Sequence, residues 1–202
     1  MTTPRTVAGA LALAAAVVLA ACGSGSSASS ASFDGVRRLE PLDVSGVDLV
    51  DARDGSEVPI PATPGEITLV YFGYTSCPDV CPTTFSDLRV AMEDIGDRAD
   101  RVTTVFVTAD PQRDTAEVMD RYVGSFLDRY DVVRVDDPSE LDAVEGPFQA
   151  TTSVGPVEPD GTYEVSHSAV VYAVDADGLV QVEWPFGTEP DAFAHDLRLL
   201  LD

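Results

Sequence analysis

Runs of apolar residues along the chain predict the strands of a buried sheet. Ile67 to Phe72 is a nearly continuous apolar, β-branched and aromatic run, which is typical of a central strand covered on both faces. Val102 to Val107 predicts a second buried strand, and Val132 to Val135 predicts a shorter one. Together these runs indicate a sheet in the interior of the fold.

Turn signals between extended segments predict two hairpins. Val36 to Glu40 and Val47 to Asp51 have the character of short strands, and Asp54-Gly55 is a turn signal between extended segments. Further along, Ala169 to Val174 and Leu179 to Val182 enclose the turn sequence Asp-Ala-Asp-Gly. We therefore expect an N-terminal hairpin and a second hairpin near the end of the chain.

Helical spacing of apolar residues predicts helices between and after these strands. Pro82 can begin the first helix, because a residue in the first turn needs no amide donor. Asp114-Thr115 opens a second helix, Pro138-Ser139-Glu140 opens a third that runs to about Phe148, and residues 190–201 form the last. The expected apolar faces are Phe85, Leu88, Val90, Met92 and Ile95 in the first helix, Val118, Met119, Tyr122, Val123 and Phe126 in the second, and Phe193, Leu197, Leu200 and Leu201 in the last. Strands that alternate with helices, followed by a closing hairpin and helix, predict an α/β sandwich with a mixed sheet.

The N-terminal segment has the features of an export signal. Arg5 precedes the apolar stretch Val7 to Ala21, which is too short for a comfortable membrane span, and small residues lead up to Cys22. This arrangement resembles the lipobox of bacterial lipoproteins, in which the chain is cut before the cysteine and that cysteine carries the acyl chains. The alternative is an ordinary N-terminal anchor with an incidental cysteine.

The lipoprotein interpretation divides the chain into three segments. Residues 1–21 would be the signal peptide, and residues 22–32 the lipidated cysteine with a flexible Gly/Ser tether. Residues 33–202 would be one domain, which is long enough to bury a real core. We expect this domain to lie on the extracytoplasmic face of the bacterial cytoplasmic membrane, anchored through the lipid at Cys22.

The charge of the chain excludes some partners. Asp and Glu number 35 against 12 Lys and Arg, which gives a formal net charge of −23, and every basic residue is an arginine. Nucleic-acid phosphates and anionic membrane surfaces would repel such a chain, so we expect no nucleic-acid partner and an anchor made by the lipid alone. The charge suits a basic partner, and it is also what a genome-wide acidic bias would produce.

Two cysteines, Cys77 and Cys81, form a pair between the predicted central strand and the helix after it. Cys81 lies near a helix N-terminus, where the helix dipole and free amides favour a thiolate. Two thiolates from one short loop suit Cu(I), whereas a structural Zn²⁺ site usually needs four protein ligands. The Cys-x-x-Cys motif of thiol–disulfide oxidoreductases has two residues between its cysteines and this pair has three, yet a redox role for the pair remains an alternative. A purely structural disulfide would close a tiny loop and gain little entropy.

The two histidines are weak signals when they are taken by themselves. His167 precedes the predicted strand from Ala169, and a histidine at a strand start is more often a polar edge residue than a ligand. His195 lies within the last predicted helix, and we interpret it as a structural or surface residue.

Three segments, taken together, resemble one known family. Residues 72–82, Phe-Gly-Tyr-Thr-Ser-Cys-Pro-Asp-Val-Cys-Pro, look like the signature loop of the Sco/SenC family, the copper chaperones of cytochrome c oxidase assembly. Asp110 to Thr115 is similar to that family's Asp-Pro-x-Arg-Asp-Thr segment. His167-Ser168, followed by Val171-Tyr172 and Asp175-x-x-Gly178, is similar to its histidine strand. The segments occur in the family's order, and the resemblance covers roughly residues 33–202.

The resemblance implies a thioredoxin-like fold with an inserted hairpin. It implies that Cys77, Cys81 and His167 bind one copper ion, as Cu(I) or Cu(II), and that the protein delivers copper to, or reduces the cysteines of, the dinuclear copper site in cytochrome c oxidase subunit II. One departure is Ser166, where the family commonly has Asp. Asp79, between the cysteines, is expected to orient the loop or to face a partner.

Two functions from different classes follow from this sequence. The first is a membrane-tethered copper chaperone, which is not an enzyme in the ordinary sense, although thiol–disulfide reduction can accompany its role. The alternative is an enzyme, a thiol–disulfide oxidoreductase or peroxidase-like protein on the same fold. The residue that separates the two is His167, because a chaperone needs it as a third ligand and a dithiol reductase does not.

Overall fold

The centre of the fold is a five-stranded mixed sheet, seen in a computed structural model that describes residues 1–2 and 32–202. Its strands are β3 (Ile67–Gly73), β4 (Val102–Thr108), β5 (Tyr130–Val133), β8 (Val170–Val174) and β9 (Val180–Pro185). They lie in the order β5-β4-β3-β8-β9. β3 pairs in parallel with β4 and antiparallel with β8, while β8 and β9 form the predicted hairpin. The mixed sheet and the central place of the run from Ile67 are therefore confirmed.

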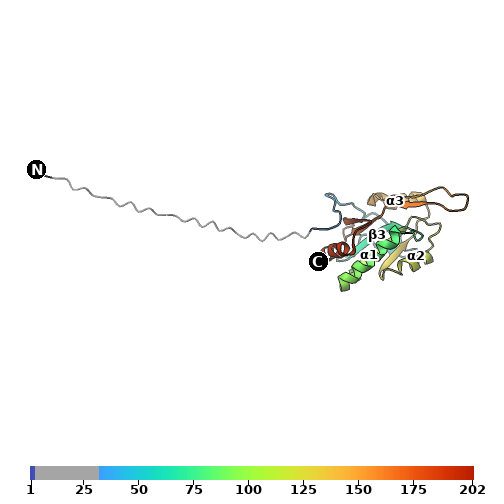
Figure 1. The fold of residues 1–202 in the computed structure, drawn as a ribbon, viewed down its shortest axis with the longest axis horizontal. Coiled ribbons are helices and arrows are strands. Elements are labelled where there is room, and N and C mark those ends of the chain that lie inside the picture. The colour runs from blue at the N-terminus through green and yellow to red at the C-terminus, as the bar shows by residue number, and fades with distance from the viewer. Residues whose placement is uncertain (3–31) are drawn as a thin grey trace. The chain divides into compact units, whose positions relative to one another are not determined.

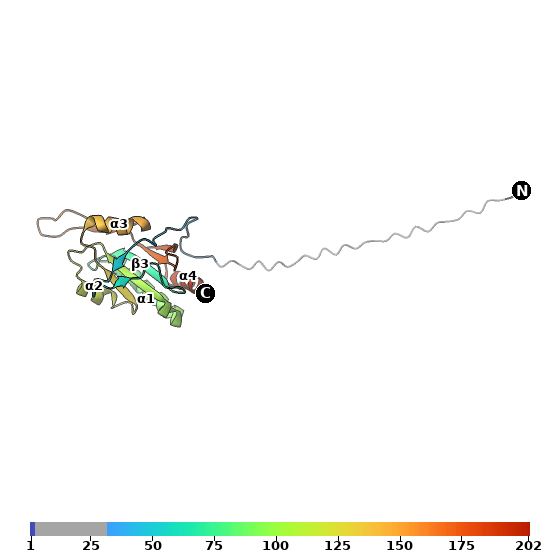
Figure 2. The same ribbon diagram turned by 180° about the vertical axis from the view of Figure 1, so that it is seen from behind.

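Helices cover both faces of this sheet and make a three-layer sandwich. In the described part of the chain they are α1 (Val80–Ile95), α2 (Ala116–Val123), α3 (Pro138–Phe148) and α4 (Pro190–Leu201), with the 3-10 helix η1 (Gly96–Arg101) after α1. α1, α2 and α4 pack on one face, and α3 packs on the other together with residues 42–60. Figures 1 and 2 show these layers from opposite sides.

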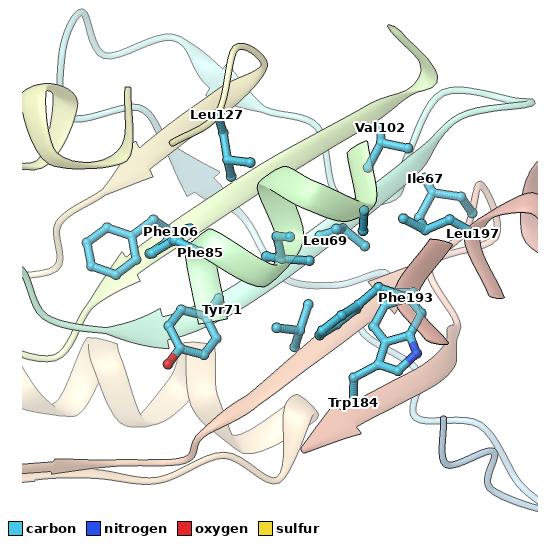
Figure 3. Packing of buried hydrophobic residues seen from close by; sticks show 14 of the residues in the cluster. Ile67, Leu69, Tyr71, Phe85, Val102, Phe106, Leu127, Trp184, Phe193 and Leu197 are labelled. Carbon is cyan, nitrogen blue, oxygen red and sulfur yellow. The ribbon is translucent and has the colours of Figure 1, made fainter. Parts of the chain in front are cut away.

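The core under α1 is built from aromatic side chains. The rings of Tyr71 on β3 and Phe85 on α1 lie 5.6 Å apart between centroids, and Phe85 and Phe106 are also 5.6 Å apart. Toward α4, Trp184 packs against Phe193 (Figure 3), and their ring centroids are 5.1 Å apart. Because Tyr71 and Phe85 flank the connection between β3 and α1, this core fixes where that loop leaves the sheet.

The opposite face of β3 is buried as well. Val70 and Phe72 alternate with Tyr71 along the strand and contact the second core, to which Phe148 of α3 belongs. The rings of Phe72 and Phe148 lie 5.5 Å apart in an edge-to-face arrangement. Burial on both faces explains why this strand has a continuous apolar sequence instead of an alternating one.

The N-terminal hairpin is confirmed, although its first strand differs from the prediction. β1 (Leu49–Val50) pairs antiparallel with β2 (Glu57–Val58) around the predicted Asp54-Gly55 turn, where Gly55 has a left-handed φ of 77°. The segment predicted as a strand from Val36 makes only an isolated bridge to β9. Residues 36–40 are all exposed, so this segment has no buried face to hold it as a full strand.

The helix boundaries and faces needed small corrections. α1 begins at Val80, two residues before the predicted start, so that Cys81 lies within the helix. The prediction that Val90 lies on the apolar face is wrong, because Val90 is 43% exposed and the neighbouring Ala91 is buried. α2 ends at Val123, so Phe126 packs from the turn after the helix. The predicted starts of α3 and α4 are confirmed at Pro138 and Pro190.

A separate two-stranded sheet carries His167. β6 (Thr152–Val154) pairs antiparallel with β7 (Val165–His167), and Thr152 stands opposite His167. This is the inserted hairpin that the family resemblance implies. Its strands have three residues each and lack a clear apolar alternation, so the hydrophobic pattern alone does not reveal them.

The predicted signal segment cannot be followed in the fold. Apart from Met1 and Thr2, residues 1–21 and the proposed lipidation site Cys22 lie outside the described residues, and so does most of the tether. These assignments stay predictions. In residues 1–2 and 32–202, none of the helices combines the length and apolar character that crossing a membrane requires.

Candidate metal centre

Cys77, Cys81 and His167 come together at one end of the central sheet. Cys77 lies in the loop after β3, Cys81 is the second residue of α1, and His167 is the last residue of β7. One ligand atom from each residue, two thiol sulfurs and one imidazole nitrogen, lies within 4.8 Å of the others. The structure thus brings together the three predicted ligands from three segments of the chain.

Cys81 occupies the most enclosed position of the three. Its side chain is fully buried, and the hydroxyl of Tyr71 lies 3.7 Å from its Sγ atom. Burial raises the pKa of the Cys81 thiol to about 12, and the nearby Cys77 adds to the effect. The sulfur packs directly over Gly73, where an added Cβ would lie 2.9 Å from it. Gly73 therefore makes room for the thiol at the end of β3.

Cys77 lies in a different electrostatic environment. Burial acts to raise its pKa, but hydrogen bonds outweigh burial, above all those from the backbone amides of Cys81 and Asp79, and leave the pKa below its ordinary value. The amide nitrogen of Cys81 lies 3.4 Å from the Cys77 Sγ atom. The helix amide that was predicted to favour a thiolate therefore stabilises the thiolate of Cys77, three residues before the helix, and not that of Cys81.

His167 presents a free nitrogen to the cysteine pair. Its Nδ1 atom lies 3.3 Å from the carbonyl oxygen of Ser168, which can only accept a hydrogen bond, so Nδ1 carries the proton. Burial lowers the pKa of His167 below its ordinary value and keeps the ring neutral. The lone pair of Nε2 then faces Cys81, with 3.4 Å between Nε2 and Sγ. This is the tautomer that a metal-binding imidazole adopts.

Two tyrosines enclose the imidazole. The ring of Tyr71 stands edge-on to His167 with centroids 5.9 Å apart, and Tyr74 does the same at 5.7 Å. Tyr74 also accepts a hydrogen bond from the amide of Cys77 through its carbonyl oxygen, with N and O 3.2 Å apart. These contacts limit the orientations open to the imidazole and to the cysteine loop.

Asp114 anchors the loop that carries Cys77. Its carboxylate is fully buried and accepts hydrogen bonds from the amide of Thr75, 3.0 Å away, and from the hydroxyl of Thr108, 2.6 Å away. The Asp-Pro-x-Arg-Asp-Thr segment, which the sequence singled out without a role, thus supports the cysteine loop from behind. Thr115 of the same segment caps α2 by accepting from the amide of Val118.

The side chains of the remaining candidates take no part in this centre. Asp79 is exposed at the start of α1 and makes no side-chain cap. Ser166 is exposed and alternates with His167 along β7, so its side chain leaves on the other side of the strand. His195 lies on α4, where its Nε2 atom is 3.1 Å from the carbonyl oxygen of Ser32.

His195 also belongs to a group with Asp34 and Asp196 whose ligand atoms lie close together. The Asp196 carboxylate already accepts hydrogen bonds from the amides of Asp34 and Gly35 and from the indole of Trp184. This cluster ties the N-terminal segment to α4 and needs no metal.

Sequence reasoning missed the residues around the ligands. Tyr71 lay within a predicted strand, and nothing in the run Ile67 to Phe72 marks it as a neighbour of Cys81. Tyr163, four residues before His167, donates a hydrogen bond from its hydroxyl to the carboxylate of Asp110. Its position in a polar loop carried no signal of this contact.

The donor set determines which metals the centre fits. Two thiols and one imidazole make a small, soft set that suits Cu(I), and the imidazole also helps to hold Cu(II). A closed tetrahedral zinc site would need a fourth protein ligand, and among the described residues no fourth His, Cys, Asp or Glu belongs to this group. The same two thiols are close enough to be a redox pair, and both are free in the structure.

Comparison with known proteins places these features in a family. The family model described as SCO1/SenC matches residues 48–202. The mitochondrial Protein SCO2 homolog of Danio rerio is 38% identical over 117 residues, which cover 57% of this chain and 42% of that protein. The chain spans about half the length of the curated relatives it matches.

Solved structures give the same result. ScoI of Bradyrhizobium japonicum with copper bound aligns with a TM-score of 0.65 and 33% identity, over 76% of this chain and 96% of that one. Apo Sco1 of Thermus thermophilus aligns with a TM-score of 0.67 and 30% identity, over 85% of this chain and 96% of that one. The predicted thioredoxin-like α/β fold is confirmed by these likenesses.

Proposed function

The chain belongs to the SCO1/SenC family, and on that premise we propose that it is a copper-binding chaperone of cytochrome c oxidase assembly. The main support for the proposal is that the ligand atoms of Cys77, Cys81 and His167 lie within 4.8 Å of one another. Relatives with the same fold have been solved with copper bound, including the Bradyrhizobium japonicum protein. Copper is the cargo of this site.

The three ligands have distinct tasks in holding the cargo. Cys77, with its lowered pKa, forms a thiolate more readily than an ordinary cysteine, and the neutral ring of His167 offers the Nε2 lone pair. Cys81, whose pKa is raised to about 12, has to release its proton when the metal binds. Since Cys77 is 9% exposed and Cys81 is fully buried, an acceptor thiolate meets Cys77 first and takes the copper by ligand exchange.

A second candidate function is thiol–disulfide exchange. The observation that favours it is the asymmetry of the pair, with a partly accessible low-pKa Cys77 and a buried high-pKa Cys81. In such a pair the first thiolate attacks a disulfide of the substrate, and the second thiol then resolves the mixed disulfide. A chaperone that reduces the cysteines of its acceptor before loading them would use the same two residues for both steps.

The proposal also names the protein that accepts the copper and the location of the domain in the cell. The acceptor is the dinuclear copper site of cytochrome c oxidase subunit II or another copper acceptor, and the acidic surface, with a formal net charge of −23, guides docking to a basic partner. The domain is held on the extracytoplasmic face of the bacterial cytoplasmic membrane by a lipid at Cys22. The support for this location is the sequence of residues 1–32.

Deletion and complementation test the proposed function. In the source bacterium, loss of the gene should lower cytochrome c oxidase activity and the copper content of subunit II, and the wild-type gene should restore both. Variants C77S, C81S and H167A should fail to restore them, while H195A should succeed. Restoration by H167A would favour the thiol–disulfide function, and normal oxidase activity without the gene would overturn both candidates.

A further inference from the structure

The metal centre is divided between two parts of the fold that are not joined by a common sheet. Cys77 and Cys81 belong to the connection between β3 and α1, on the central sheet. His167 belongs to the two-stranded sheet of β6 and β7, which pairs with no other strand in the described part of the chain. The chain runs from His167 through Ser168 and Ala169 into β8, which ties that end of β7 to the central sheet. At the other end of β7, the position of the strand depends on side-chain contacts that connect the two parts.

Asp110, Arg113 and Tyr163 make one such connection, which we call the tyrosine bridge. Asp110 follows β4 and is only 1% exposed. Its Oδ1 atom accepts a hydrogen bond from the Tyr163 hydroxyl at 2.7 Å, and its Oδ2 atom pairs with the guanidinium of Arg113. The guanidinium lies over the ring of Tyr163, 4.1 Å from its centroid. Tyr163 is therefore held by its hydroxyl and by its ring.

The bridge reaches both halves of the metal centre. Tyr163 precedes β7 by two residues, so the bridge fixes the start of the strand that ends at His167. On the other side, the Arg113 guanidinium lies 5.9 Å from the centroid of Tyr74. Tyr74 contacts the His167 ring edge-on and accepts the hydrogen bond of the Cys77 amide. A continuous set of contacts thus runs from the histidine hairpin to the cysteine loop.

We propose that Tyr163, held by Asp110 and Arg113, is a positioning residue that sets the place of His167 relative to the cysteine pair. The inference rests on the proposed copper site for its effect on metal binding, but the placement of His167 can be measured without metal. Breaking the hydrogen bond between Tyr163 and Asp110 frees the hairpin, and His167 then spends less time within reach of Cys81. The cysteine pair is held by α1 and Asp114, so its own geometry is unaffected.

The chain contains a matched control for this bridge. Tyr130 donates its hydroxyl to the carboxylate of Asp120 at 3.0 Å, and Arg53 lies over its ring, 5.0 Å from the centroid. Tyr130, Asp120 and Arg53 repeat the chemistry of the tyrosine bridge at the N-terminal end of β5. Asp110 and the cysteine loop follow the C-terminal ends of the parallel strands β4 and β3, at the opposite edge of the sheet. Y163F and Y130F each remove one hydroxyl-to-carboxylate bond, and only Y163F removes it near His167.

The experiment compares these variants in the compact unit Ala31–Asp202. In the reduced, metal-free protein, nuclear Overhauser contacts between the imidazole of His167 and the ring of Tyr74 should weaken in Y163F and persist in Y130F. With copper as the probe, Y163F should lose Cu(II) to a chelator about tenfold faster than wild type, a change of the size expected for one charge-assisted hydrogen bond. Y130F should stay within about twofold of wild type.

A double-variant cycle distinguishes positioning from general loosening. If Tyr163 acts through His167, Y163F should have no further effect on copper loss in the H167A background. An undiminished effect in that background, or equal effects of Y163F and Y130F, would overturn the proposal, and so would unchanged imidazole contacts in metal-free Y163F. Failure of the wild-type protein to bind copper would instead overturn the proposed function, and the metal-free measurement would still decide the role of Tyr163.

Discussion

The Nε2 atom of His167 lies 3.4 Å from the Sγ atom of Cys81, although 86 residues separate the two in the sequence. With Nδ1 committed to the Ser168 carbonyl, the neutral imidazole offers its lone pair to whatever binds the thiol. The pairing turns a dithiol loop into a three-donor centre. It is the relationship that separates a copper chaperone from a simple dithiol protein on the same fold.

Removal of the imidazole should weaken copper binding without disturbing the cysteines. We expect H167A to lower Cu(II) affinity by more than about 100-fold, because loss of a residue that merely supports a ligand already costs roughly 10- to 100-fold. The measurement is competition with a chromophoric chelator. H195A is the matched control, since His195 lies on α4 and contacts Ser32. Unchanged affinity in H167A would rule out the three-ligand site.

The two thiols should differ in their reaction with an alkylating agent. In the reduced, metal-free protein, Cys77 should react first, with a rate that rises at a pH below the ordinary pKa of a thiol, because hydrogen bonds stabilise its thiolate. Cys81 should react slowly until the pH approaches 12, because burial raises its pKa to about that value. Peptide mass spectrometry after timed labelling with iodoacetamide measures both rates. Equal labelling of the two residues at neutral pH would contradict the asymmetry.

A methyl group added at Gly73 should disturb the packing around the Cys81 sulfur. In G73A the new Cβ would lie 2.9 Å from the Cys81 sulfur and 2.9 Å from the ring of Tyr71. We expect the free energy of unfolding to fall by about 1–3 kcal/mol, as for other overpacked cores, and copper affinity to fall with it. Urea unfolding measures the first effect. G46A is the control, since no atom of the described residues lies within 4 Å of a Cβ there. An equal loss of stability in both variants would argue against the packing explanation.

Glu145 should make the stability of the fold depend on pH. It is 3% exposed on α3, and its Oε2 atom accepts a hydrogen bond from the amide of Thr152, while Oε1 has no partner among the residues that the structure describes. Burial raises its pKa in the folded state, so the folded chain binds its proton more tightly than the unfolded chain does. Its contribution is therefore fully present below the ordinary glutamate pKa of about 4.3 and is lost as the pH rises through the raised value.

The variant E145Q removes this titration and tests the sign. Between pH 4 and pH 7, the free energy of unfolding of E145Q relative to wild type should rise, because only the wild type has to bury a carboxylate at the higher pH. Chemical unfolding at a series of pH values measures the difference. A relative stability of E145Q that falls with pH would contradict this account.

The sequence was most informative where local chemistry decides the structure. The apolar run from Ile67 predicts the central strand because burial on both faces demands it, and the cysteine spacing places Cys77 and Cys81 at the junction of that strand and α1. The helix amide effect was predicted for the wrong residue, because it depends on which sulfur faces the amide of Cys81. That choice is made by the packing of Gly73 and Tyr71 around Cys81.

The rest of the site depends on long-range contacts that carry no local pattern. His167 ends a three-residue strand, and its assignment as a ligand needed the family resemblance. The contact between Tyr163 and Asp110 joins residues 53 positions apart across two loops. No periodicity or propensity records such a pairing, because it joins the β6–β7 hairpin to the residues after β4 through side chains that are distant in the sequence.

X-ray absorption of the copper-loaded domain tests the central claim most directly. The unit Ala31–Asp202 would be reduced, titrated with Cu(I) to one equivalent, and measured together with H167A. The account predicts one copper per chain with two sulfur ligands and one nitrogen ligand, and loss of the nitrogen in H167A. A coordination shell without nitrogen, or one that is the same in wild type and H167A, would contradict the three-donor centre of Cys77, Cys81 and His167.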